Sequence, residues 1–408
     1  MQPVWAGHPW IYAQAIARVE GGARAGDEVR VVDPQGKFLG RGFYSPASAI
    51  PVRILVRDET TLVSTELFRQ RLLDAQRLRQ ELRLPSDHTN GYRLVHAEGD
   101  ALPGLIVDVY DDQCVVQVTT LGMKQREGLW LEALQEVLHP RAIINRTSAD
   151  VARREGFSPS NGVLRGEETA PVLRFRERGF AYEIPTELTQ KTGFYFDQRP
   201  LRARVETLAH GARVLDAFSF VGTFALAAAR GGAKEVTAVD ENAVALEVAA
   251  ETARRNGYEG QIRYLRDDAR NVLRQAAETD PYDVVLCDPP KLAPTRMSRD
   301  GGLQAYRKLA ELGCRATVPG GLLVLCSCSA TVSMDGLTRA LALGARTAGV
   351  RATILERHFQ GADHPVPASF PEGLYLKSLL VRLGTLLVHA SSPRPITRNV
   401  RAARRTRI

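Results

Sequence analysis

Residues 213–229, RVLDAFSFVGTFALAAA, and residues 235–240, EVTAVD, decide the fold class of this chain. The first stretch predicts a strand that ends at Asp216, a loop that holds Gly222, and a helix. The second predicts a strand that ends at Asp240. Strand and helix patterns keep alternating to about residue 383. The sequence therefore predicts a Rossmann-like α/β domain with a doubly wound, mostly parallel sheet.

The glycine loop of this unit indicates the kind of ligand. It holds one glycine, Gly222, and lacks the G-x-G-x-x-G pattern that approaches a pyrophosphate. A nucleoside without phosphates is the better ligand, and S-adenosylmethionine (AdoMet) fits. Asp216 would face its ammonium group and Asp240 its ribose, because ligands bind at the carboxyl ends of such strands. Asp268 ends a third strand and either meets the adenine amino group or caps the next helix.

A nucleophilic cysteine is predicted at the same edge of the sheet. Cys328 lies between two serines at the end of the strand GLLVLCSCS, and DPPK ends the strand before it. A thiolate can attack carbon 6 of cytosine, after which carbon 5 can take a methyl group from a sulfonium. Asp288 would assist at N3, and Lys191 or Lys291 would raise the thiolate fraction.

The other cysteines predict neither a metal site nor a disulfide framework. Cys326 and Cys328 lie two apart and should face the same way in a strand. This pair lacks a second ligand pair at a plausible spacing, so no metal is expected. The five cysteines of the chain are an odd number, as a reducing cytoplasmic compartment would allow.

Composition and charge describe a globular chain with a basic end. The 408 residues are 44% hydrophobic and 25% charged, and no stretch is long and apolar enough to span a membrane. No secretory signal is visible. Of the net charge of +8, six charges come from arginines in residues 391–408. This tail is either a solvated, disordered end or an arm that binds phosphate groups.

Four regions follow from these patterns. Residues 1–65 predict a small β domain, residues 66–185 an α+β middle domain, residues 186–383 the AdoMet domain, and residues 384–408 the basic tail.

The motifs together resemble a known family, the bacterial large-subunit rRNA methyltransferases that form 5-methylcytosine. Its members have an N-terminal PUA domain, an α+β middle domain and an AdoMet domain, so rRNA is the expected partner. The resemblance covers nearly the whole chain. It rests on GHPWIY, GYRLVHAEGDALPGLIVDVYDD, QKTGFYFDQR, DAFSFVGTF, AVD, DPPK, SCS and HPVPASFPEGLYLK, in this order.

The resemblance implies roles for individual residues. Cys328 is the nucleophile, with Asp288 and Lys191 beside the reacting base. The residues assigned to the cofactor are Asp216, Phe218, Gly222, Asp240, Asp268, Asp288, Gln198 and Arg199. Phe194 and Asp197 are expected near the cofactor and the target base. The residue that removes the proton from carbon 5 stays open.

Two alternatives compete with this interpretation. One is an rRNA guanine methyltransferase on a similar scaffold, which needs no cysteine nucleophile. The other is a non-catalytic RNA-binding factor for ribosome assembly. The presence of Cys328 together with Asp216, Asp240 and Asp288 speaks against both. The sequence leaves open whether the chain is a monomer or a homodimer.

Overall fold

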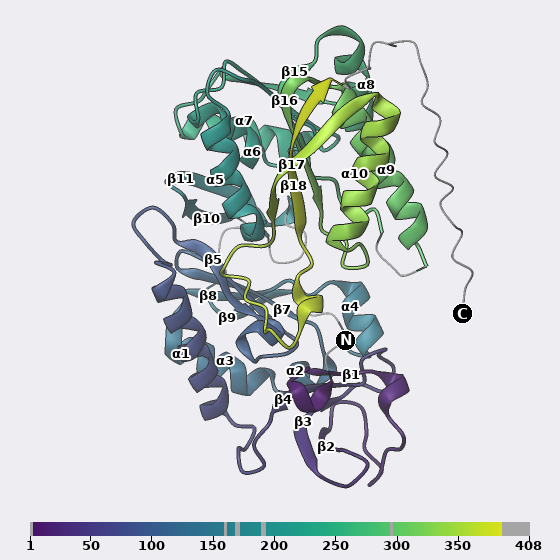
Figure 1. Ribbon diagram of the computed structural model, residues 1–408. Coiled ribbons are helices and arrows are strands. Elements are labelled where there is room, and N and C mark those ends of the chain that lie inside the picture. The colour runs from purple at the N-terminus through teal and green to yellow at the C-terminus, as the bar shows by residue number, and fades with distance from the viewer. Residues whose placement is uncertain (1–2, 159–160, 168–171, 189–192, 294–296, 386–408) are drawn as a thin grey trace, which may run out of the picture.

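The computed structural model describes residues 3–158, 161–167, 172–188, 193–293 and 297–385. Figure 1 shows three parts stacked along one axis: a small sheet that begins the chain, a middle sheet with helices, and a larger parallel sheet. Most of the predicted basic tail, and Lys191, lie outside the described residues. Within the described residues, no helix is long and apolar enough to cross a membrane.

The first part is an antiparallel sheet of order β1-β4-β3-β2. Its strands are β1 (Trp10–Ile11), β2 (Glu28–Val32), β3 (Phe38–Tyr44) and β4 (Val52–Val56). Asp33 stabilises the β2–β3 turn, because its Oδ1 accepts hydrogen bonds from the backbone N–H groups of Gln35 and Lys37. The predicted small β domain is confirmed as structure.

The middle part is a five-stranded mixed sheet of order β5-β6-β7-β8-β9. It comprises α1 (Thr65–Glu81), β5 (Gly91–His96), β6 (Leu105–Tyr110), β7 (Gln113–Val118), α2 (Leu121–Gln125), α3 (Glu127–Leu138), β8 (Ala142–Asn145), α4 (Ala149–Glu155) and β9 (Gly162–Gly166). Helix α1 begins at Thr65, because the Ser64 side chain accepts a hydrogen bond from the Leu67 N–H and so caps the first turn. Its buried side, including Phe68 and Leu72, joins the core under the sheet.

A separate hairpin links the middle part to the third. It consists of β10 (Val172–Glu177) and β11 (Phe180–Pro185), and alternate residues are buried as period-two patterning predicts. Its buried side chains, such as Phe175 and Tyr182, share one core with Phe194, Phe196 and the helices of the third part. The predicted division after residue 185 thus falls inside a continuous core.

The third part has the predicted doubly wound sheet, with order β14-β13-β12-β15-β16-β18-β17. Strands β12 to β16 run parallel, and β18 is antiparallel to both of its neighbours. The elements are α5 (Arg199–Leu208), β12 (Arg213–Asp216), α6 (Thr223–Arg230), β13 (Glu235–Asp240), α7 (Ala243–Arg255), β14 (Ile262–Arg266), α8 (Ala269–Thr279), β15 (Tyr282–Cys287), α9 (Arg299–Arg315), β16 (Thr317–Ser327), α10 (Met334–Ala348), β17 (Val350–His358) and β18 (Lys377–Thr385). The strand order reverses between β12 and β15, which is where such sheets bind ligands.

The segment between β17 and β18 ties the three parts together. In Figure 1 it descends from the parallel sheet past the middle sheet toward the N-terminal part, and then returns. Ser369 Oγ donates to the Gly7 carbonyl at 3.0 Å, and the Phe370 ring lies 4.5 Å from the Trp10 ring. Gly99 permits the approach to the middle part, since a Cβ there would lie 2.0 Å from the Pro365 carbonyl oxygen.

Candidate active site

A cavity of about 660 Å³ opens at the carboxyl ends of β12, β13, β15 and β16. This volume is in the range that holds a cofactor or a small ligand. Six of the predicted site residues line it, from segments far apart in the chain: Gln198, Phe218, Asp240, Asp268, Asp288 and Cys328. Phe194 and Asp197 line it as well.

Asp240 is held in place by the loop that follows β12. Its Oδ2 accepts a hydrogen bond from the Phe220 N–H at 2.8 Å, and its Oδ1 accepts one from the Asn242 N–H at 2.9 Å. Each carboxylate oxygen can accept a second bond. Asp240 can therefore also accept hydrogen bonds from vicinal hydroxyls in the cavity.

Asp216 lies beneath the same loop rather than on the cavity wall. Its Oδ2 accepts from the Ala225 N–H at 3.1 Å, while its buried Oδ1 has no hydrogen-bond partner among the described residues. Burial raises the pKa of Asp216 to about 8. The hydroxyl of Ser219, three residues further along the loop, is also buried without a described partner. These two unsatisfied oxygen atoms fit a ligand with a cationic end. A cation near Asp216 would pair with its carboxylate and favour the ionised form.

The structure explains the glycine at position 222 by helix packing and not by the predicted contact with the cofactor. It caps the start of α6 with φ +70°, and a Cβ there would lie 2.8 Å from the Ala249 Cβ on α7. The glycine thus allows α6 and α7 to pack closely, and it does not line the cavity. Asp268 caps α8, since it accepts from the Arg270 N–H, and it also lines the cavity. Its contact with an adenine amino group stays a prediction.

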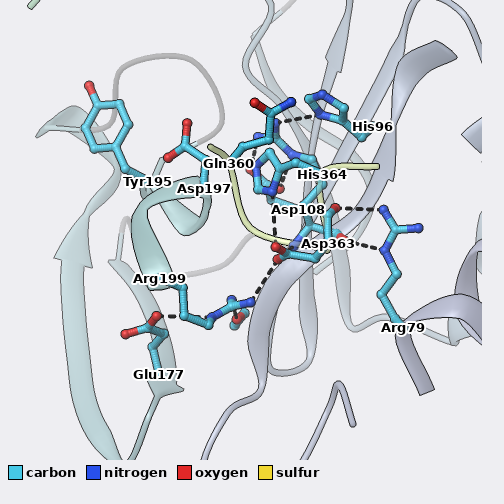
Figure 2. Close-up of polar contacts among 12 residues, drawn as sticks. Arg79, His96, Asp108, Glu177, Tyr195, Asp197, Arg199, Gln360, Asp363 and His364 are labelled. Carbon is cyan, nitrogen blue, oxygen red and sulfur yellow. Dashed lines mark hydrogen bonds and ion pairs between the residues drawn. The ribbon is translucent and has the colours of Figure 1, made fainter. Parts of the chain in front are cut away.

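Arg199 is not brought to the cofactor side, which corrects the prediction. Its guanidinium forms ion pairs with Glu177 at 3.1 Å and Asp363 at 3.0 Å, and donates to the Gly91 carbonyl at 2.8 Å. Figure 2 shows Arg199 between these two carboxylates, below Asp197. The physical reason is that a cation here neutralises two fully buried carboxylates that belong to different parts of the fold.

Asp288, after β15, faces the cavity next to Gln198. Its Oδ2 accepts from Gln198 Nε2 at 2.8 Å. Burial, followed by the nearby charge of Asp197, raises the pKa of Asp288 to about 7. At neutral pH a substantial fraction of Asp288 is therefore protonated and can donate a hydrogen bond.

Cys328 lies one residue beyond the end of β16 and lines the cavity, whereas Cys326 does not. The expected common direction of these two side chains depended on a strand that continues through Cys328, and the strand ends at Ser327. Cys326 is buried in the core, and burial raises its pKa well above the usual value. The geometry therefore assigns Cys326 to packing and leaves Cys328 as the thiol that a ligand can reach.

The turn that carries Cys328 is attached to the segment after the two prolines. Ser329 Oγ accepts from the Ala293 N–H at 3.2 Å, and Thr331 Oγ1 donates to the Ala293 carbonyl at 2.7 Å. These bonds hold the thiol in register with Pro289 and Pro290, which line the same cavity.

Two residues near the thiol escaped the sequence analysis. Lys377, the last residue of the motif HPVPASFPEGLYLK, is buried and donates to the Ser329 carbonyl at 2.9 Å. Lys291, one of the two lysines expected there, is exposed to solvent. Tyr195 lines the cavity with 38% of its surface exposed. The sequence signal that could have indicated Lys377 is a lysine at the start of an apolar strand, LKSLLV at residues 376–381. A lysine in such a run is expected to be buried, and buried lysines are rare and need a reason.

The described residues contain no group of three or more His, Cys, Asp or Glu side chains that could hold a metal ion.

Comparison with known proteins agrees with this geometry. Residues 2–57 match a model of the PUA-like domain, and residues 92–371 match a model of the S-adenosylmethionine-dependent methyltransferase. Ribosomal RNA large subunit methyltransferase I of Erwinia tasmaniensis is 35% identical over 378 residues, which are 92% of this chain and 95% of that protein. The protein of the same name from Alteromonas mediterranea is 37% identical over 375 residues, covering 91% and 94%.

Solved structures have the same fold at lower identity. A protein described as a candidate methyltransferase, complexed with SAH, has a TM-score of 0.82 at 20% identity, covering 93% of this chain and 96% of that one. A candidate SAM-dependent methyltransferase from Streptococcus mutans has a TM-score of 0.78 at 19% identity, covering 92% and 95%.

Proposed function

Because this chain belongs to the S-adenosylmethionine-dependent methyltransferase family, we propose that it forms 5-methylcytosine in large-subunit ribosomal RNA through a covalent adduct with Cys328. Its relatives are named ribosomal RNA large subunit methyltransferase I, and its N-terminal part matches the PUA-like domain. The name of these relatives specifies large-subunit rRNA as the substrate. It specifies neither the base nor the atom that is methylated, and these two points are the proposal.

The observation that carries the proposal is a single cavity with two chemically different ends. It is lined by Asp240, Asp268, Asp288 and Cys328. The strand order places Asp240 and Asp268 after β13 and β14, where a nucleoside would bind, and Asp288 and Cys328 after β15 and β16, on the other side of β12. Transfer to a nitrogen with its own lone pair needs no thiol. Carbon 5 of cytosine is a poor nucleophile and needs one, because attack at carbon 6 makes it electron-rich.

The residues of the chain divide the work as follows. AdoMet, when bound, supplies the electrophilic methyl group. Asp240 would accept hydrogen bonds from the ribose hydroxyls of AdoMet, and the buried carboxylate of Asp216 would compensate the charge of its ammonium end from behind the cavity wall. Cys328 Sγ bonds to carbon 6 of the cytosine while Asp288 donates a hydrogen bond to N3. After methylation, carbon 5 loses its proton to solvent, and the electron pair of that bond forms the double bond between carbons 5 and 6. The bond between sulfur and carbon 6 breaks with its electrons returning to sulfur, which restores both the aromatic base and the thiolate.

The test is a covalent trap. We expect large-subunit rRNA that contains 5-fluorocytidine to form a stable adduct with the protein, because fluorine cannot leave as the proton does. Peptide mass spectrometry should locate the adduct at Cys328. The Cys328→Ser variant should form no adduct and show no turnover, yet bind AdoMet as the wild type does in calorimetry.

Cys326→Ser is the matched control, since Cys326 lies two residues away and outside the cavity. It should keep both the adduct and turnover. An adduct located at Cys326, or normal turnover by Cys328→Ser, would overturn the proposal. A methyl group found on a guanine by mass spectrometry of the product would do so as well.

A further inference from the structure

Lys377 is a buried cation beside the candidate nucleophile. Its side chain is 3% exposed, and its Nζ donates to the carbonyl oxygen of Ser329, the residue after Cys328. The antiparallel pairing of β16 with β18 sets Lys377 opposite Ser327, the residue before Cys328. The ammonium therefore lies against the backbone that directly follows β16 and carries the thiol.

The charge of Lys377 needs a partner in this place. A buried ammonium is costly unless an anion or several acceptors compensate it. One acceptor is the Ser329 carbonyl, and among the described residues no carboxylate forms an ion pair with Lys377. Burial lowers the pKa of Lys377 to about 8, and the charge of the Cys328 thiolate acts in the opposite direction.

We propose that Lys377 is a positioning residue whose ammonium is the counter-charge of the Cys328 thiolate, so that the nucleophile is ionised before the base arrives. The proposal rests on the proposed role of Cys328. The interaction is reciprocal: if the thiolate favours the charged lysine, the charged lysine favours the thiolate to the same extent. Lys377 itself forms no bond to the substrate in this scheme.

Within the part of the chain that the structure describes, the other charged and titratable groups near the thiol do not supply this charge. They are Tyr195 and Asp197 next to α5, Arg202 on α5, Asp288 after β15, Cys326 on β16, and Tyr306 and Lys308 on α9. The phenols and carboxylates disfavour a neighbouring thiolate when ionised. Arg202 is paired with Glu177 at 3.0 Å, and Lys308 with Glu311 at 3.0 Å.

The experiment measures the ionisation of Cys328 directly. The full-length protein is alkylated with iodoacetamide from pH 5.5 to pH 10, and mass spectrometry gives the rate at Cys328 for the wild type, Lys377→Met and Lys377→Arg. In the wild type the midpoint should lie below the unperturbed cysteine value of about 8.5. Lys377→Met should raise the midpoint by about one pH unit or more, a roughly tenfold loss of rate at pH 7.

Lys377→Arg retains the charge and should keep a midpoint close to that of the wild type. Lys291→Met removes the exposed lysine of the DPPK turn and should leave the midpoint unchanged. AdoMet binding by calorimetry verifies that each variant is folded. A folded Lys377→Met variant whose alkylation midpoint equals that of the wild type would overturn the proposal. A midpoint that rises in Lys291→Met and not in Lys377→Met would overturn it as well. If Lys377→Met does not fold, a wild-type midpoint at or above 8.5 still refutes it.

The 5-fluorocytidine trap separates this inference from the proposed function. If the wild type forms the adduct and Lys377→Met forms it with the same pH dependence, only the role of Lys377 fails. If the wild type forms no adduct at Cys328, the proposed function fails, while the alkylation midpoint still shows whether the ion pair exists.

Discussion

Burial raises the pKa of two carboxyl groups, those of Asp216 and Asp288. The two groups affect ligand binding in different ways. Asp288 faces the cavity and has a polar neighbour in Gln198, so its proton is available to a bound base. Asp216 is fully enclosed, and one of its oxygens has no partner within the described part of the chain. Its environment is complete only when a cation binds nearby.

Asp216 makes the stability of the ligand-free protein depend on pH. Its pKa is raised to about 8 in the folded protein, against about 3.9 in an unfolded chain. The folded state thus holds this proton more tightly, and stability falls as pH rises from about 4 to about 8. Asp216→Asn removes this loss. We expect its melting temperature, relative to the wild type, to rise between pH 5 and pH 8 in calorimetry without AdoMet.

Added AdoMet provides the control for this prediction. A bound ammonium favours the ionised carboxylate, so saturating AdoMet should reduce the advantage of Asp216→Asn at pH 8. A difference in melting temperature that is constant from pH 5 to pH 8 would show that Asp216 titrates normally.

At the scale of elements, the close packing of α6 and α7 depends on the cap of one helix. Gly222 is in the left-handed region, and the Ala249 side chain fills the space that a Cβ would need. Because the loop before Gly222 carries Phe218 and Phe220, a shift of this cap would also move the wall of the cavity.

Gly222→Ala should therefore cost more than backbone strain alone. Gly260 is the matched control, since it has φ +75° and nothing within 4 Å of its would-be Cβ. We expect Gly260→Ala to lower the free energy of unfolding by about 1–2 kcal/mol, and Gly222→Ala to lower it further, as measured by urea denaturation. If the two variants lost the same free energy of unfolding, α7 would move away from the added methyl group without an energetic penalty, and the packing argument would fail. Weaker AdoMet binding in Gly222→Ala alone would connect this packing to the site.

At the scale of the whole molecule, Asp363 joins the segment between β17 and β18 to both larger parts. Its Oδ2 accepts from the Arg93 N–H at 3.1 Å and from Arg199 Nη1 at 3.0 Å, and Arg79 donates to its carbonyl oxygen at 2.8 Å. Figure 2 shows the side chains of Arg79 and Arg199 approaching Asp363 from opposite sides. Burial alone would raise the pKa of Asp363, but the neighbouring His364 and Arg199 hold it well below the usual value.

Asp363→Ala should loosen the contact between the middle and AdoMet-binding parts. The substitution leaves Arg199 with one of its two carboxylates, and it leaves the Arg93 N–H of β5 without its acceptor. We therefore expect the free energy of unfolding to fall by about 3–5 kcal/mol. Scanning calorimetry should show the single transition broadening or splitting in two. Glu356→Ala, which removes the partly exposed partner of Arg204, is the control and should cost at most about 1 kcal/mol. A similar loss in both variants would show that Asp363 does not couple the two parts.

Local patterns were sufficient for much of this protein. The alternation of strands and helices predicted the doubly wound sheet. Of the four acidic residues predicted at strand ends, Asp240, Asp268 and Asp288 line the cavity and Asp216 does not. The strand-end pattern brings these residues to one edge because parallel strands end on the same side, wherever they lie in the chain.

Only the tertiary structure decided which distant cations meet which anions. Arg199 adjoins the predicted cofactor segment in sequence, yet it pairs with Glu177 and Asp363, which come from β10 and the segment after β17. Lys377 lies 49 positions after Cys328, and the pairing of β18 with β16 brings it to the thiol. Such contacts depend on strand order and register, which arise from packing across the whole core and leave no periodic signal in the residues that make them.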